Sequence, residues 1–410
     1  MFTGGELMNS QRASLIYALG LSYASMVSLA IAVNLAPVLL TTLSFALGGQ
    51  EGLTNEQLGR IGATTFVGLV AGIVLAGPLA DRFGAKRFAV AANLLVAAGL
   101  AILGLAPGYP AVLAAVFVMG LGAGILDLVL SPIVSALQSD RRTSAMNWLH
   151  SFYSIGAVAT ILAGSLMLRL GVGWRATALG LIAFPVMVAG GFLGVKVPPL
   201  VAEGRTRTPL LRLGRRAYFI AAVAAIFLAG ATELGLAQWL PAYAEVGLGF
   251  SKWTGGMALL AFSVAMAVGR IGVGVVGHRV AAVPLMIGCC AAAVGLFLAG
   301  CFAPWPAVAL GACMGVGLAV SCLWPCTLAA AADRFPHGGA SMFGLLSAVG
   351  NFGGIFMPWV IGVTADGWTM RWGIATGTFA PLAMALVLVW VWRQPGAPPE
   401  PAAEAGGDTQ

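Results

Sequence analysis

Two carboxylates lie well inside long apolar segments of this chain. The sequence holds 14 acidic residues, and all except Asp127 and Glu233 fall in loops, in tails or at the ends of apolar segments. An ionised carboxylate at membrane depth costs about 2.5–3.5 kcal/mol, a cost that favours its protonated form. We therefore interpret both residues as proton-coupling groups. A structural role for Asp127, paired with His150 or Asn147 of the next segment, is the alternative.

A stripe of polar side chains occupies that next apolar segment. Asn147, His150, Ser151 and Ser154 recur at i, i+3, i+4 and i+7, on one face of a helix, with Tyr153 beside that face. Polar groups inside a membrane turn toward a cavity or a neighbouring helix, because lipid offers them no hydrogen bonds. We expect Asn147, His150 and Tyr153 to bind substrate. For His150, a hydrogen bond within a helix contact is the alternative.

The segment around Glu233 combines hydrogen-bonding groups with aromatic rings. Gln238 offers a donor and an acceptor, and Trp239 offers a flat apolar face, a mixture suited to a sugar. An aromatic belt at the membrane surface explains Trp239 equally well, and it is the favoured interpretation of Tyr243. The remaining substrate-binding candidates are Asn34, Trp324 and Asn351.

The sequence lacks the patterns of an enzyme or a metalloprotein. It contains no G-x-x-x-x-G-K-S/T loop for ATP, and no Ser/His/Asp constellation outside the apolar segments. The 6 cysteines lie in apolar segments without metal-ligand spacing to histidine, so we expect them to be small packing residues. The sequence thus predicts no enzyme activity, no metal and no cofactor, with a proton gradient as the driving force.

The segments that carry these residues are predicted to be membrane helices. The chain is 60% hydrophobic and only 9% charged, whereas soluble domains carry about a quarter charged residues. Twelve apolar segments approach the roughly 20 residues that cross a bilayer. They cover residues 13–47, 57–80, 88–106, 109–138, 146–168, 176–196, 217–244, 253–277, 281–301, 304–331, 340–363 and 373–392. The predicted fold class is an all-α membrane protein of twelve transmembrane helices, with the lipid bilayer as its surroundings.

The distribution of basic residues predicts the orientation of these helices. Most lysines and arginines lie at the termini or in loops after even-numbered segments, and few lie on the other side. The positive-inside rule then places both termini in the cytoplasm of a bacterial-type inner membrane. The net charge of +7 is a signal of topology and implies no binding to nucleic acid.

Internal spacing indicates two similar halves. Thr54 precedes Asp81 by 27 residues, as Ser251 precedes His278, and Pro132 and Pro325 each precede an Asp-Arg pair by eight residues. We predict six-helix bundles at 1–197 and 217–393. A basic, proline-containing cytoplasmic linker at 198–216 joins them, and a disordered tail follows at 394–410.

One loop carries a recognisable motif. The run GPLADRFGAKR contains Gly77, Asp81, Arg82, Gly84 and Arg87, and it resembles the loop signature of the major facilitator superfamily. The resemblance implies two pseudo-symmetric six-helix bundles, transport by alternating access, and a conformational latch formed by these five residues. In the second half His278 stands where the aspartate would be, so a second latch is not expected.

A narrower resemblance covers two segments. GLGAGILDLVLSPIVSAL (120–137) and NWLHSFYSIGA (147–157) resemble the fucose/proton symporter branch of that superfamily. This resemblance implies that Asp127 carries a proton and that the substrate is a small polar solute such as a monosaccharide. We expect a monomer to take up this solute. The first segment departs from the branch, with Asn34 and no acid. A proton-driven exporter of amphipathic compounds or metabolites is the alternative, and a membrane sensor is a third hypothesis.

Overall fold

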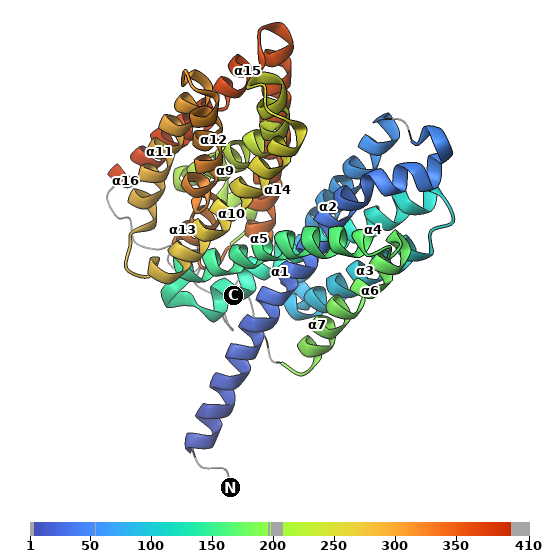
Figure 1. Cartoon of the computed structure of the whole chain (residues 1–410). Coiled ribbons are helices and arrows are strands. Elements are labelled where there is room, and N and C mark those ends of the chain that lie inside the picture. The colour runs from blue at the N-terminus through green and yellow to red at the C-terminus, as the bar shows by residue number, and fades with distance from the viewer. Residues whose placement is uncertain (1–3, 54, 196, 198–207, 395–410) are drawn as a thin grey trace. The chain divides into compact units, whose positions relative to one another are not determined.

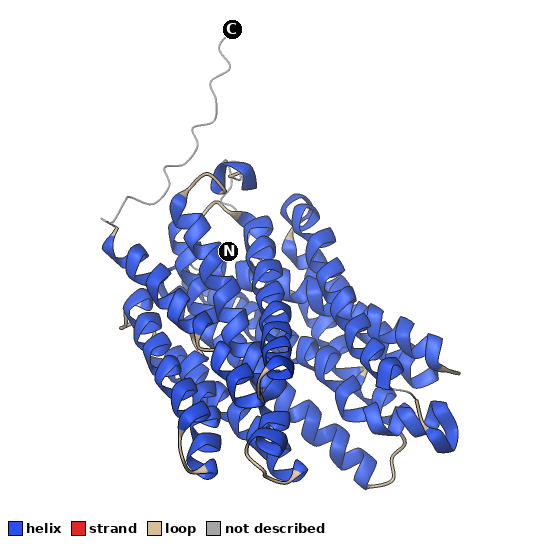
Figure 2. Cartoon of the chain, turned by 90° about the horizontal axis from the view of Figure 1, so that it is seen from above, coloured by secondary structure: helices blue, strands red, loops and turns tan. Residues whose placement is uncertain are grey.

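The computed structural model is all-helical over the residues that it describes, which are 4–53, 55–195, 197 and 208–394 (Figure 2). Twelve helical segments within these ranges are long and apolar enough to cross a membrane, which confirms the predicted fold class. The predicted tail beyond 394 and the linker residues 198–207 lie outside the described residues, as do Thr54, Lys196, Arg205 and Arg207.

Figure 1 shows the order of the helices along the chain. The first part of the chain forms α1 (Gly4–Gly48), η1 (Gly49–Glu51), α2 (Asn55–Phe83), α3 (Ala85–Leu105), α4 (Tyr109–Leu137), η2 (Ser139–Arg141), α5 (Arg142–Arg169), α6 (Trp174–Leu181) and α7 (Ala183–Leu193). The second part forms α8 (Leu210–Leu213), α9 (Ala217–Ala242), the π-helical turn η3 (Tyr243–Gly247), α10 (Lys252–Val276), α11 (Ala282–Phe302), α12 (Pro306–Val320), α13 (Leu323–Arg334), α14 (Gly339–Gly367), α15 (Met370–Thr376) and α16 (Phe379–Arg393).

Contacts group the chain into two compact units. Unit 1 comprises Met1–Leu137, Ile155–Glu203 and Gly339–Gly344, and unit 2 comprises Gln138–Ser154, Gly204–Gly338 and Leu345–Gln410. The first half of α5 therefore belongs to unit 2, and the first turns of α14 belong to unit 1. The predicted division of the chain at 197 and 217 stays a prediction.

Glycines bring helices α2 and α4 into backbone contact within unit 1. A Cβ atom on Gly124 would lie 1.9 Å from the carbonyl oxygen of Leu69, and one on Gly120 would lie 2.1 Å from that of Thr65. Small residues allow such close approach, which maximises van der Waals contact where lipid supplies no hydrophobic drive. The glycine-rich composition thus serves packing in this unit.

Within the described residues, three membrane spans are broken into two helices, and each break lies three or four residues before a proline. The breaks separate α6 from α7, α12 from α13, and α15 from α16, ahead of Pro185, Pro325 and Pro381. Proline has no N–H, so it leaves the carbonyl four residues earlier without its helical partner. The break before Pro325 frees the carbonyl of Ser321, a group that reappears in the candidate site.

The predicted aromatic belt is wrong for Tyr243. Its side chain is 0% exposed, and its hydroxyl donates a hydrogen bond to the Gly300 carbonyl of α11 at 2.7 Å. Gly247 makes room for the ring, since a Cβ there would lie 2.4 Å from it. Tyr243 is therefore an internal packing residue of unit 2.

Candidate functional site

A buried ion pair lies inside unit 2, between α9 and α10. The Nη2 atom of Arg270 donates to both carboxylate oxygens of Glu233, at 3.0 and 2.9 Å. The Arg270 side chain is only 3% exposed, and that of Glu233 is 13% exposed. Removing one partner of such a buried pair leaves an uncompensated charge, which costs about 3–5 kcal/mol. Each charge therefore depends on the other or on a ligand that replaces it.

Three further groups hold the guanidinium. Its Nε donates to the Ser321 carbonyl at 3.1 Å, the group that Pro325 leaves without a helical donor. Its Nη1 donates to the Ser154 hydroxyl at 2.9 Å and reaches the His150 carbonyl at 3.5 Å. Arg270 is thus fixed by α5, by α9 and by the break between α12 and α13.

The predicted polar stripe on α5 turns inward, because Asn147, His150, Ser151 and Ser154 are all buried. Asn147 Nδ2 donates to the Thr143 carbonyl at 2.8 Å and to Cys326 Sγ at 3.3 Å. Asn147 Oδ1 and His150 Nε2 are buried and have no hydrogen-bond partner within the part of the chain that the structure describes. Buried polar atoms rarely lack a hydrogen-bond partner, so these two atoms are candidates for contacts with a ligand or with water.

The other predicted substrate residues do not join this cluster through any contact described for them. Asn34 and Asn351 donate to carbonyls one turn back in their own helices, those of Ala30 and Ser347, each at 2.9 Å. Trp239 Nε1 donates to the Pro358 carbonyl at 2.8 Å, so the indole bridges α9 and α14. Of the other predicted substrate-binding residues, Gln238 is exposed, Tyr153 is half-buried, and Trp324 packs against Gly230 and Gly350.

Asp127 lies on α4 in unit 1, half-buried, and Glu233 lies on α9 in unit 2. The two predicted proton-coupling residues thus belong to different units. Of the predicted residues, Glu233 contacts Arg270 through its carboxylate and His150 does so through its backbone carbonyl. Sequence reasoning missed Arg270, although an arginine in the middle of an apolar segment is itself a signal of function.

The predicted latch motif contains one strongly bonded residue. The Asp81 carboxylate accepts hydrogen bonds from the Ala340 N–H at 2.6 Å, the Ser341 N–H at 3.1 Å and the Ser341 hydroxyl at 2.5 Å. These donors form the first turn of α14, where helical N–H groups lack internal partners and the helix dipole favours an anion. All three residues belong to unit 1.

The rest of the motif shapes the loop. Gly84 adopts φ +86, a conformation that glycine allows at the junction of α2 and α3. Gly77 lies beside Ser341, with 3.8 Å from an added Cβ to the Ser341 Cα, and the Arg82 guanidinium stacks 5.3 Å from the Phe83 ring. Arg87 is exposed.

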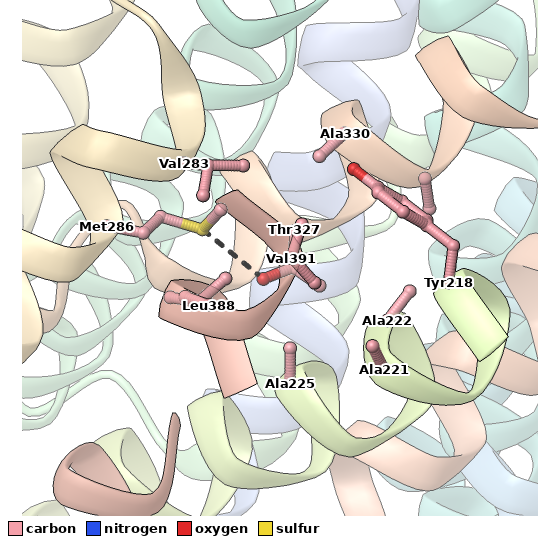
Figure 3. A pocket seen from close by; sticks show the side chains of 11 residues that line it. Tyr218, Ala221, Ala222, Ala225, Val283, Met286, Thr327, Ala330, Leu388 and Val391 are labelled. Carbon is pink, nitrogen blue, oxygen red and sulfur yellow. Dashed lines mark hydrogen bonds between the residues drawn. The ribbon is translucent and has the colours of Figure 1, made fainter. Parts of the chain in front are cut away.

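A small cavity in unit 2 does not fit a solute (Figure 3). Its lining residues come from α9, α11, α13 and α16, and Thr327 donates a hydrogen bond to Met286 Sδ at 3.5 Å. Its volume of about 20 Å³ holds about one water molecule. A larger hollow of about 500 Å³ near Trp368 and Trp372 is lined by apolar side chains and threonines, without a charged group. Neither competes with the Arg270 cluster as a site for a polar solute.

Comparison with known proteins identifies a family whose model this sequence matches. The Major Facilitator Superfamily model matches residues 17–318 and 256–409. The gentisate transporter of Corynebacterium glutamicum is 27% identical over 85% of this chain and 77% of its own length. NarK2 of Mycobacterium tuberculosis, named as a probable nitrate/nitrite transporter, is 24% identical over 80% of this chain and 85% of its own length. The E. coli fucose:proton symporter FucP matches in structure with a TM-score of 0.79 at 20% identity, over 92% of this chain and 99% of FucP, a likeness of fold.

Proposed function

We propose, since this chain belongs to the Major Facilitator Superfamily, that it carries a small polar solute across the membrane by alternating access, coupled to protons. Membership of that superfamily makes it a multi-pass membrane transporter and not an enzyme. The observation that carries the proposal is the Glu233–Arg270 ion pair, which is buried within membrane-spanning helices.

Proton coupling follows from the chemistry of that pair. A proton on Glu233 removes its negative charge and leaves the Arg270 guanidinium without a counter-charge. A buried charge without a partner is costly, so protonation of Glu233 favours binding of a solute at Arg270. Asp127, the second membrane carboxylate, is the other proposed proton-coupling residue, in unit 1.

The polar lining supports a polar solute over an amphipathic one. Asn147 Oδ1 and His150 Nε2 are buried without a hydrogen-bond partner among the described residues, on the α5 face whose Ser154 hydroxyl accepts from Arg270. An apolar drug-like solute would leave both atoms unsatisfied. The monosaccharide expected from the fucose-symporter resemblance stays one candidate. The relatives named for gentisate and nitrate/nitrite add carboxylates and inorganic oxyanions to the candidates.

The remaining proposals concern the setting of the transporter. The basic loops support a bacterial-type inner membrane with both termini in the cytoplasm. We also propose uptake by a monomer, with Asp81 of the loop motif holding one conformation through its bonds to the first turn of α14.

The test uses the purified chain in proteoliposomes. A thermal-shift panel of sugars, polyols, organic acids and oxyanions selects a bound solute, and uptake of that solute is then driven by an acidic exterior. We expect uphill accumulation that a protonophore abolishes and that Asp127→Asn or Glu233→Gln reduces strongly. If the Asp127→Asn protein still accumulates the solute uphill when the proton gradient is collapsed, proton coupling is contradicted. Everted vesicles that expel the solute on acidification would indicate export instead.

A further inference from the structure

We infer that Arg270 is the receptor for a planar monoanion, either a carboxylate or an inorganic oxyanion, which exchanges with the Glu233 carboxylate. The inference rests on the proposed function and names the substrate class of that site. It requires that no carboxylate span the two Nη atoms of the guanidinium at present, that a ligand can reach them, and that the anion restore the negative charge that protonation of Glu233 removes.

The Glu233 carboxylate does not span the two Nη atoms of the Arg270 guanidinium. Planar carboxylates bind arginine most strongly when two nitrogens of the fork each donate to a different oxygen. Here both Glu233 oxygens share the single Nη2 atom, at 3.0 and 2.9 Å. The adjacent Nη1 is held by the neutral Ser154 hydroxyl and by a long contact to the His150 carbonyl. A planar anion that spans Nη1 and Nη2 would therefore make a stronger pair than Glu233 does.

The exposure of the two partners gives the direction of exchange. The Arg270 side chain is 3% exposed, whereas that of Glu233 is 13% exposed. A ligand therefore meets Glu233 first and displaces it. The Ser321 carbonyl keeps Nε in place at 3.1 Å throughout, because Pro325 offers that carbonyl no competing N–H.

Charge balance then selects an anion over a neutral solute. Protonated Glu233 no longer compensates Arg270, and the groups left on the guanidinium, from Ser321, Ser154 and His150, are neutral. A sugar in this position would leave the buried charge uncompensated. One proton and one monoanion together leave the net charge of the pair unchanged, so exchange at this pair is electroneutral.

Two unsatisfied atoms on the α5 face that contacts Arg270 through Ser154 support the same site. Asn147 Oδ1 and His150 Nε2, on the α5 face that also carries Ser154, are buried and without a hydrogen-bond partner among the described residues. An imidazole N–H at Nε2 would donate to an oxygen of the anion, and Asn147 Oδ1 would accept from a hydroxyl of a substituted carboxylate.

The first experiment measures binding to the full-length protein by calorimetry between pH 5.5 and 7.5. The probes are acetate and benzoate for the carboxylate class, nitrate for the inorganic class, and benzamide as the neutral match of benzoate. We expect at least one anion to bind, with affinity rising by up to about tenfold per pH unit as the solution is acidified. Benzamide should not bind. The anion that binds identifies whether the site takes a carboxylate or an inorganic oxyanion.

The second experiment uses variants of the pair. Glu233→Gln, which imitates the protonated acid, should bind the anion with an affinity that no longer depends on pH. It should retain anion exchange and lose accumulation driven by the proton gradient. The double variant Arg270→Gln/Glu233→Gln leaves no lone buried charge, so it should fold, as a thermal melt checks, and lose anion affinity by about tenfold or more. Arg270→Lys keeps the positive charge without the forked guanidinium. Its affinity for the anion should lie between those of the wild-type protein and the double variant.

Three results would overturn the inference. They are failure of all three anions to bind the wild-type protein, binding of benzamide equal to that of benzoate, and unchanged anion affinity in the folded double variant. The proposed function fails in a different way, when a solute that binds is never accumulated in a proton-dependent manner. A neutral sugar that is accumulated with protons would leave the proposed function standing and refute the anion.

Discussion

Asp81 and Ser341 are joined twice, since the carboxylate accepts both the N–H of Ser341, at 3.1 Å, and its hydroxyl, at 2.5 Å. Together with the Ala340 N–H, these bonds cap the first turn of α14 with a full negative charge. The loop motif around Asp81 is thus tied to a residue 260 positions later in the chain. Sequence alone assigned the motif a latch role but gave no partner for it.

Substitution Asp81→Asn should weaken this cap. An amide has one acceptor oxygen and places two N–H groups beside the donors of Ala340 and Ser341, so at least one hydrogen bond to a charged group is lost. Such bonds contribute roughly 1.5–3 kcal/mol. We expect a lower melting temperature of the purified protein. Asp140→Asn is the matched control, because Asp140 is exposed and is bonded locally to Ser139. Equal melting temperatures for the two variants would contradict a bonding role for Asp81.

Substitution Gly124→Ala should destabilise unit 1. The added methyl group would meet the Leu69 carbonyl oxygen at 1.9 Å and force α2 and α4 apart. Overpacking of this kind costs about 1–3 kcal/mol. Gly62→Ala on α2 is the control, since nothing lies within 4 Å of its added Cβ. Alanine favours a helix over glycine, so the control should be neutral or slightly stabilising in a thermal melt. A Gly124→Ala protein as stable as the control would show that the two helices are not in backbone contact.

The sequence predicts the spans well and the contacts poorly, for a physical reason. The length of an apolar run is a local property, and each predicted segment overlaps an observed span, as 281–301 does Ala282–Phe302. A partner is not local, because Arg270 meets Glu233 37 residues away and Ser154 116 residues away. Arg270 was therefore not among the candidate site residues predicted from the sequence. Tyr243 was assigned to the membrane surface because aromatic rings suit both that surface and a packed interior.

Substitution Tyr243→Phe should cost stability without affecting transport. It removes the hydrogen bond to the Gly300 carbonyl, made at 2.7 Å by a side chain that is 0% exposed, and keeps the ring. The net loss should be about 0.5–1.5 kcal/mol. Tyr17→Phe is the control, because Tyr17 is 69% exposed. This variant should have the melting temperature of the wild-type protein. The prediction fails when the two variants melt alike, or when Tyr243→Phe alone changes the affinity for the solute.

Substitution Pro325→Ala should disturb the site through the backbone. Alanine supplies an N–H four residues after Ser321, so the Ser321 carbonyl gains a helical donor that competes with Arg270 Nε, now bonded at 3.1 Å. Closing the break between α12 and α13 should leave thermal stability equal or higher, while the maximal rate of solute uptake falls. Pro185→Ala closes the equivalent break between α6 and α7 in unit 1, where no contact to Arg270 is involved, and it should change uptake less. Uptake by Pro325→Ala equal to that by Pro185→Ala would mean that the freed carbonyl of Ser321 is not needed to position the guanidinium.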